Sequence, residues 1–568
     1  MKNISVWITK NKRKAWFSLG LNLLIMAGIF ILMMPFYETN DDLTMCEFID
    51  GSWGSTDGHL VFQSYILGIF YEFLYRLPLT LPWYALFQYF VLWLSFSAVT
   101  YVILQRLENG SGFFVTAVLL MFFAYECYIR MQFSKVAGIA TGAALFLLLY
   151  AVTREHLSAP MLTCGWLLGC VGSLFRFDEF LACGALMTGI GVWLLLELRQ
   201  IEKGKRLRRL GRYLFTFGVM VMLAVFLRLY NNDSYDSDPL WSSYNEYNDT
   251  RCLLQDYGFP EYNANKEVFD SLGLNEDAYR LFGFWNINDP EVFTVEVMKE
   301  LTKLQPQRTL NGELIRGFFR EVPKGFFQIY VFYGVLILAA LWLLWGEHGR
   351  SSILSLLYEA LMFGTVYFYL YYAGRYLINR VDVGLWFAVA LVFIWMLNSE
   401  KMRFSGQEGV IFCLFLLLAN QSVWSNDWRI DSSHSLEAKA RERAILEEIS
   451  SDKEHLYLAK INTLSGGNSF WPFDCLKKGL LDNISWLGGW ETNSAVGLHV
   501  LESWGITNPY RDMIDNPDVY LIDGDIKLTL RYLQTYYDEN VTATLVKKVG
   551  GLKVYRIGGS NETVIDVD

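Results

Sequence analysis

Charged residues are scarce in this chain of 568 residues. Asp, Glu, Lys and Arg make up 19% of it, whereas about 25% is usual in a soluble domain. Hydrophobic residues make up 53%, and long apolar runs recur along the first three quarters of the chain. Each run is close to the roughly 20 residues that an α-helix needs to cross a bilayer. The composition therefore argues against a soluble globular chain and predicts a polytopic α-helical membrane protein.

Several functional patterns are also missing. The eight cysteines show no metal-ligand spacing, and the glycine pairs near the C-terminus lack the pattern of a nucleotide-binding loop. No small-residue cleavage site follows the first apolar run, Trp16–Pro35, so we expect a retained helix in place of a signal peptide. The net charge is −10, and basic residues cluster in a few short loops. This charge pattern indicates membrane topology and argues against a nucleic-acid partner.

Eleven apolar segments are predicted to cross the membrane, and one further segment, 58–78, is ambiguous. The eleven lie near residues 16–36, 83–104, 111–128, 135–152, 160–176, 180–198, 212–230, 326–346, 352–373, 383–398 and 408–424. The loop Arg199–Arg212 is rich in Lys and Arg, which places it in the cytoplasm by the positive-inside rule. With a cytoplasmic N-terminus, the loop reaches that side only if 58–78 does not cross. We therefore expect 58–78 to form an interfacial helix at the outer face.

This topology places three sizeable regions outside the membrane, at 37–82, 231–325 and 425–568. The last region has the pattern of a folded domain. Helices are expected at 436–449 and 526–537, and strands at 455–459, 519–522, 542–547 and 552–557. We predict a transmembrane module over 1–424, which includes the first two outer regions, followed by a small extracytoplasmic α/β domain over 425–568.

Two adjacent carboxylates, Asp41 and Asp42, follow directly after the first predicted span. A carboxylate at the membrane surface can act as a general base toward an acceptor hydroxyl, or can hold a divalent metal ion. Acidic residues also flank the outer ends of membrane helices without such a role. The surroundings favour a site, because Glu47, Asp50, a glycine-rich stretch over 51–58 and the interfacial segment follow in order.

A first span, an acidic outer loop and a helix lying on the membrane form an order of parts that resembles the GT-C superfamily of membrane glycosyltransferases. The resemblance is closest to bacterial members that use lipid-phosphate sugars, the protein mannosyltransferase and aminoarabinose transferase types. It extends over the architecture of the whole chain, but its residue motif covers only the first outer loop. The chain departs from these relatives at residues 57–60, which read Asp-Gly-His-Leu where a Glu-Lys-Pro-type element would stand.

The resemblance implies an inverting glycosyltransferase of the cell membrane with a GT-C-like fold. The catalytic carboxylate would be Asp41 or Asp42, with Asp41 preferred. The donor would be a polyprenyl-phosphate-linked sugar, and the acceptor a glycan, lipid or protein of the cell envelope at the outer face. No cofactor is required, although the adjacent carboxylates permit a divalent metal.

Cations in the outer loops are candidates for binding the lipid phosphate, because arginine and lysine side chains neutralise phosphate well. The candidates are Arg375, Arg380, Arg176 and Lys135, with His59 as a further substrate contact. Ordinary pairing is the alternative. Arg176 can pair with Asp178 or Glu179, Arg380 can pair with Asp382, and His59 can anchor the interfacial segment.

Two other functions are compatible with the same architecture. A transporter or flippase for a lipid-linked sugar would often show internal repeats and a site near the middle of the bilayer, but the chain has no clear repeat and few charges within its spans. A non-catalytic envelope-assembly protein would keep the architecture without the chemistry. We predict the glycosyltransferase, with membrane lipids as its other partners.

Overall fold

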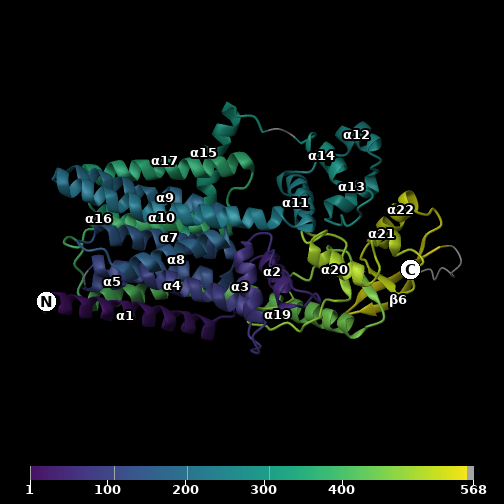
Figure 1. Ribbon diagram of the computed structural model, residues 1–568, viewed down its shortest axis with the longest axis horizontal. Coiled ribbons are helices and arrows are strands. Elements are labelled where there is room, and N and C mark those ends of the chain that lie inside the picture. The colour runs from purple at the N-terminus through teal and green to yellow at the C-terminus, as the bar shows by residue number, and fades with distance from the viewer. Residues whose placement is uncertain (1, 108, 201, 306–307, 468, 560–568) are drawn as a thin grey trace.

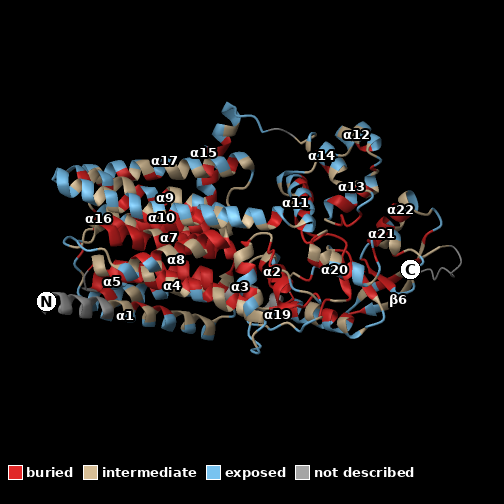
Figure 2. Cartoon of the chain, viewed as in Figure 1, coloured by how far each residue is buried: buried red, intermediate tan, exposed pale blue. Residues whose placement is uncertain are grey.

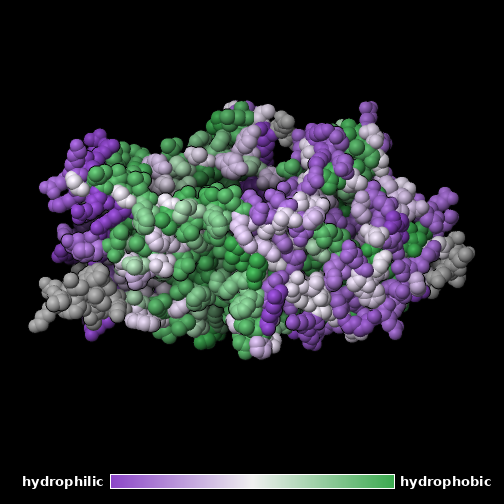
Figure 3. Space-filling view, viewed as in Figure 1, coloured by the Kyte–Doolittle hydropathy of each residue, from purple (hydrophilic) through white to green (hydrophobic). Residues whose placement is uncertain are grey.

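The computed structural model describes residues 2–107, 109–200, 202–305, 308–467 and 469–559. Long helices lie side by side in one half of the molecule, and the segments 239–302 and after 450 fill the other half (Figure 1). Apolar side chains form a band across the helical half, between hydrophilic ends (Figure 3). We call the end of the bundle that meets the C-terminal domain the domain end.

Among the described residues, seven helices are long and apolar enough to cross a membrane, or eight if the pair α15 (Gly312–Phe326) and α16 (Tyr330–Trp345), bent by 90°, counts as one span. The seven spans lie in α1 (Lys2–Leu32), α4 (Trp83–Arg106), the run of α5 (Asn109–Leu119), η1 (Leu120–Ala124) and α6 (Tyr125–Ile129), α7 (Phe133–Thr153), α9 (Phe177–Glu197), α10 (Lys203–Asp236) and α17 (Arg350–Ala373). These spans confirm a polytopic α-helical membrane protein. The number of eleven crossings stays a prediction.

The other predicted spans are also helical. Segments 160–176 and 383–398 correspond to α8 (Ala159–Phe175) and α18 (Asn379–Trp395), each of 17 residues. Segment 408–424 is the first part of α19 (Gly406–Ser451), which continues without a break past the domain boundary predicted at 424. Segment 58–78 contains α3 (Tyr65–Tyr75). Its 11 residues make a helix of roughly 16 Å, which is too short to cross a bilayer.

Helix α7 lies at the centre of the bundle, where α4, α8, α9 and α18 pack around it. Figure 2 shows it almost entirely buried. It approaches α18 closely at Gly138 and Gly384, where a Cβ atom added to Gly138 would lie 2.6 Å from the Cα of Gly384. Small residues allow such contact between membrane helices. This contact places the start of α18 beside the start of α7 at the domain end.

The C-terminal domain is an α/β unit, as predicted. Its five strands lie in the order β4 (Ile484–Trp486), β3 (Leu456–Ala459), β5 (Val519–Ile522), β7 (Leu552–Gly558) and β6 (Thr542–Val549). Strands β4, β3 and β5 are parallel, whereas β7 is antiparallel to both β5 and β6. Helices α20 (Ala495–Ser503), α21 (Pro509–Asp512) and α22 (Ile526–Tyr536) complete it. Four of the strands match the predicted ones, and the three-residue β4 was not predicted.

Residues 239–302 of the predicted outer region 231–325 pack onto this domain. The helices of this stretch are α11 (Pro239–Tyr257), η3 (Asn263–Asn265), α12 (Lys266–Ser271), α13 (Glu276–Gly283) and α14 (Val295–Thr302), whereas α15 packs on α17. The buried carboxylate of Asp289 accepts hydrogen bonds from the hydroxyls of Tyr532 and Tyr537, both at 2.7 Å, and from Asn508 Nδ2 at 3.1 Å. Two regions far apart in the sequence therefore form one body beside the domain end of the bundle.

Candidate active site

The acidic pair lies in the first turn of α2 (Asn40–Asp50). Just before it, β1 (Phe36–Tyr37) pairs in parallel with β2 (Arg130–Met131), and the Glu38 N–H donates to the Met131 carbonyl at 2.9 Å. This pairing holds the segment that follows the first span against the segment that enters α7. The start of a helix also favours negative charge, because its free N–H groups carry partial positive charge.

Asp42 is fully buried and held from three sides. Its Oδ1 accepts hydrogen bonds from the Tyr84 hydroxyl at 2.8 Å and from Gln88 Nε2 at 3.0 Å. Its Oδ2 accepts from the Phe133 N–H at 3.4 Å. Burial raises the pKa of Asp42 to about 7, although these hydrogen bonds favour the charged form. The geometry makes Asp42 a positioning group that ties α2 to α4 and α7.

Asp41 is only partly buried, and its side chain accepts a hydrogen bond from the Thr39 hydroxyl at 3.3 Å. Burial raises the pKa of Asp41, and the positive charges of Arg380 and Arg176 oppose that rise, as does the Thr39 hydrogen bond. Asp41 is therefore within electrostatic reach of two of the predicted phosphate-binding arginines. Of the acidic pair, Asp41 is the carboxylate that a substrate could reach.

A buried ion-pair network positions Arg380. The preceding residue, Asn379, donates to Glu126 Oε1 at 2.7 Å and to Glu38 Oε1 at 3.2 Å. Lys135 Nζ lies 2.7 Å from Glu126 Oε1 and 2.5 Å from Glu38 Oε2. The network thus joins the acidic loop, α6, α7 and the first turn of α18. It gives Lys135 two carboxylate partners, so this lysine belongs to the framework of the site and is no free cation.

Arg380 itself is partly exposed. In the part of the chain that the structure describes, no ion pair of Arg380 is formed, including the alternative pair with Asp382. Asp382 instead accepts a hydrogen bond from the Tyr367 hydroxyl at 2.6 Å. The charge of Arg380 acts on two carboxyl groups, Asp41 and Glu179, and at Asp41 it opposes the rise in pKa that burial causes.

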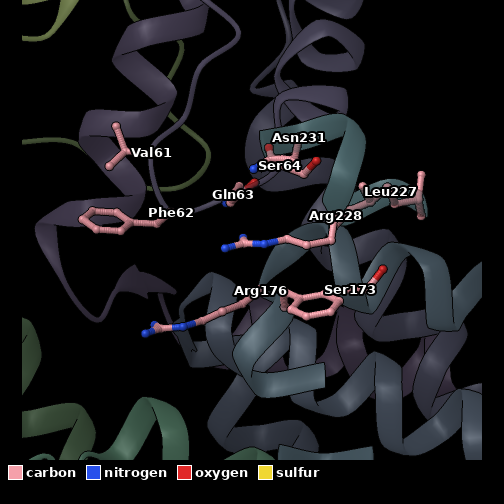
Figure 4. Close-up of a pocket in the computed structure, with 11 residues that line it drawn as sticks. Val61, Phe62, Gln63, Ser64, Ser173, Arg176, Leu227, Arg228 and Asn231 are labelled. Carbon is pink, nitrogen blue, oxygen red and sulfur yellow. The ribbon is translucent and has the colours of Figure 1, made fainter. Parts of the chain in front are cut away.

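One pocket is lined by two arginines, Arg176 and Arg228, whose side chains extend in the same direction (Figure 4). Arg176 Nη1 donates to Ser134 Oγ at 2.7 Å, and Arg228 lies over the Phe177 ring at 5.5 Å. Within the described residues neither arginine forms an ion pair with a carboxylate, so the alternative pairing of Arg176 with Asp178 or Glu179 is not formed. Two such guanidinium groups in one pocket suit an anion.

The opposite wall of this pocket is the segment that leads into α3. Gln63 and Ser64 contribute polar groups, and Asn231 of α10 faces them (Figure 4). Asn231 Oδ1 accepts a hydrogen bond from the Tyr65 N–H at 2.9 Å, and the Ser64 N–H donates to the Leu174 carbonyl at 2.8 Å. The predicted interfacial segment is thus fixed to α8 and α10 and forms part of the site.

His59 occupies an aromatic cluster and is not among the residues that line the arginine pocket. Its ring stacks on Tyr65 and Trp241 at 4.2 and 4.8 Å. Its Nδ1 lies 2.7 Å from Asp57 Oδ1, and Asp57 Oδ2 accepts from Trp241 Nε1 at 2.9 Å. This geometry fits the anchoring alternative for His59.

Arg375 lies on the loop between α17 and α18 and pairs with Asp256 at 3.0 Å. Of the four predicted cations, Arg176 and Arg380 are the two whose charges lower the pKa of Asp41, whereas Arg375 and Lys135 are paired with other carboxylates. Arg228 was not predicted as a site residue, although an arginine inside an apolar run is costly and thus a signal of function. Gln63 and Asn231 were not predicted either, because they come together only in the folded chain.

Over the described residues, no group of three or more His, Cys, Asp or Glu side chains could hold a metal ion. The reachable chemistry is that of a single carboxylate, Asp41, with neighbouring arginines. In this arrangement the Asp41 carboxylate can accept a proton, and the arginines can neutralise an anion.

No family model matches the chain, and no curated protein matches it by sequence. Two crystal structures of ArnT from Cupriavidus metallidurans are similar to it over nearly their full length. The apo structure is 12% identical with a TM-score of 0.38, covering 97% of this chain and 98% of that one. The structure bound to undecaprenyl phosphate is 12% identical with a TM-score of 0.37, covering 95% and 97%. Scores this low do not establish a common family, so the function has to follow from the side chains of the site.

Proposed function

We propose that this chain is an inverting membrane glycosyltransferase that moves a sugar from a polyprenyl-phosphate carrier to an acceptor at the outer face of the cell membrane. The observation that carries the proposal is the partly exposed Asp41, whose pKa is lowered by the charges of Arg176 and Arg380, together with the pocket that Arg176 shares with Arg228. A general base next to an anion site is what transfer from a phosphate-linked sugar requires.

In the proposed reaction, Asp41 accepts the proton of the acceptor hydroxyl. The acceptor oxygen forms a bond to the anomeric carbon as the bond from that carbon to the phosphate oxygen breaks. The electron pair of the broken bond goes to the phosphate, and Arg176 and Arg228 neutralise the charge of the departing polyprenyl phosphate. Attack opposite the leaving group inverts the anomeric configuration.

The surroundings of the pocket suit a lipid carrier. Arg228 lies in the domain-end half of α10, where Phe226 and Leu229 are 63% and 62% exposed. Such residues can contact an apolar chain while the arginines hold its phosphate at headgroup level. The opposite end of the bundle carries the basic segment Arg199–Arg212, which we assign to the cytoplasm by the positive-inside rule. That assignment places Asp41 at the outer face.

The position of the site favours transfer over transport. A carrier binds its substrate near the middle of the bilayer and has no need of a base. Here α2, which carries the candidate base, lies at the end of the bundle next to the body formed by residues 239–302 and the C-terminal domain (Figure 1).

The proposal can be tested with the purified chain in proteoliposomes. Radiolabelled polyprenyl-phosphate sugars from native membranes are supplied together with an envelope extract as acceptor. We expect release of free polyprenyl phosphate and a glycosylated acceptor of inverted anomeric configuration, with neither product in protein-free vesicles. Movement of intact lipid-linked sugar across the bilayer without such release would instead support the transporter.

A further inference from the structure

Helix α15 has one side that no other described residue covers. Its buried side includes Phe318, which packs edge-to-face on Phe368 and Tyr371 of α17 at 5.2 and 5.6 Å. On the uncovered side, Ile315 and Phe319 are 41% and 70% exposed. The helix is therefore attached to α17 along one side and leaves large apolar side chains free on the other.

The uncovered side of α15 is divided into two strips. Arg316, Arg320 and Lys324 are exposed and stand four residues apart, so they form a basic strip along the helix. Ile315 and Phe319 form an apolar strip next to it. A helix with adjacent apolar and basic strips suits the boundary between acyl chains and anionic headgroups.

The orientation of α15 agrees with such a position. It meets the apolar helix α16 at 90°. Since α16 runs along the bundle, α15 lies in the plane of the membrane, and Figure 1 shows it across the domain-end part of α17. Phe327, directly after α15, is 58% exposed and continues the apolar strip toward α16.

The charged side chains of α15 form few ion pairs and hydrogen bonds with the other described residues of the protein. Arg320 pairs with Glu321 at 2.8 Å, and Arg316 Nε donates to the Gly312 carbonyl at 3.0 Å. The other carboxylate oxygen of Glu321 accepts from the hydroxyls of Tyr371 and Tyr376 at 3.3 and 3.2 Å. Glu321 is thus turned toward α17. Glu313 is the other carboxylate of α15, and the three cations outnumber the two carboxylates, so the helix keeps a net positive charge.

The same helix supports the rim of the candidate active site. A Cβ atom added to Gly325 would lie 2.1 Å from Leu377 Cδ1, so α15 packs directly on the loop between α17 and α18. Leu377 has a φ of 56°, a left-handed conformation that is rare outside glycine. The loop carries Arg375 and leads to Arg380, so the position of α15 bears on the position of both arginines.

We propose that α15 binds anionic phospholipid headgroups of the leaflet at the domain end. Arg316, Arg320 and Lys324 contact the headgroup phosphates, while Ile315 and Phe319 enter the acyl region. Bound headgroups hold α15 against the loop that carries Arg375. The proposal rests on the shape and charge of α15 and does not depend on the proposed function.

The test uses the full-length chain in nanodiscs of equimolar phosphatidylglycerol and phosphatidylcholine, with retained lipids counted by native mass spectrometry. We expect the wild type to retain phosphatidylglycerol preferentially. One cation near an anionic surface changes lipid binding about fivefold, so R316Q/R320Q/K324Q should lower the retained ratio at least about fivefold. The matched control K527Q/K548Q/K553Q removes the same charge from exposed positions of the C-terminal domain and should leave the ratio unchanged.

An unchanged ratio in the α15 triple variant, or an equal fall in both triple variants, would overturn the proposal. The segment Arg199–Arg212 is intact in all of them, so its contribution to lipid binding is constant. If the triple variant does not fold, the single variants R316Q and K324Q replace it. Each should lower the ratio by a smaller amount, and wild-type ratios in both would also overturn the proposal.

Discussion

The Asp41→Asn variant is expected to transfer sugar about 10³-fold more slowly than the wild type, because general-base catalysis contributes roughly 10²–10⁴-fold to such reactions. Asparagine has the same shape and can still accept the Thr39 hydrogen bond, but it cannot take the proton of the acceptor hydroxyl. The measurement is kcat in proteoliposomes, with membrane insertion and thermal unfolding followed in parallel. Both are expected to match the wild type.

Asp42→Asn is the matched comparison, because the two residues are neighbours of the same type. Its amide group would face the Phe133 N–H or the donors of Tyr84 and Gln88, which leaves at least one buried hydrogen bond unmade. We expect a loss of about 1–3 kcal/mol in the free energy of unfolding and a smaller fall in kcat than for Asp41→Asn. Full activity of Asp41→Asn, or equal losses in kcat from both variants, would contradict the assignment.

The pH dependence of kcat distinguishes a base from a structural carboxylate. A base must be deprotonated, so the rate rises with pH through the pKa of Asp41. Burial raises that pKa, so the acid limb should lie above the range of ordinary aspartates. Arg380→Gln removes a positive charge that opposes the rise, and should move the limb to higher pH.

The second large effect is expected at the arginine pocket. Each charge-assisted hydrogen bond contributes about 1.5–3 kcal/mol, so Arg176→Gln or Arg228→Gln alone should weaken polyprenyl-phosphate binding about 10- to 100-fold. The double variant should weaken it more than either single one. The measurement is the Kd for polyprenyl phosphate in detergent, with the uncharged polyprenol as a competitor that should be insensitive to both substitutions.

Arg443→Gln is the control for this series, because Arg443 lies on α19 within the C-terminal domain and is 42% exposed. Its Kd should equal that of the wild type. A Kd unchanged by Arg176→Gln and Arg228→Gln together would show that the phosphate lies elsewhere.

Much of the fold could be predicted from hydropathy, because an apolar run near 20 residues has few alternatives to a membrane helix. The strands at 519–522 and 552–557 could be predicted in the same way from their apolar content. The three-residue β4 could not, because its pairing with β3 depends on residues close in space and distant in the chain.

In the site, too, the sequence predicted some residues, whereas their contacts depend on the fold. Adjacency in the sequence identified Asp41 and Asp42 as a pair, but their roles differ because only Asp42 meets Tyr84 and Gln88 in the fold. Lys135 was a candidate cation until the structure placed Glu38 and Glu126 beside it. Arg228 was missed because it was counted within an apolar span, and only the contact between α8, α9 and α10 brings it next to Arg176.

The most direct test of the central claim is a structure of the wild-type chain with polyprenyl phosphate bound. The proposal predicts the phosphate within hydrogen-bond distance of Arg176 and Arg228, on the side of the pocket that faces Asp41, with the polyprenyl chain along α10. A phosphate bound near the middle of the bundle, or away from both arginines, would contradict it.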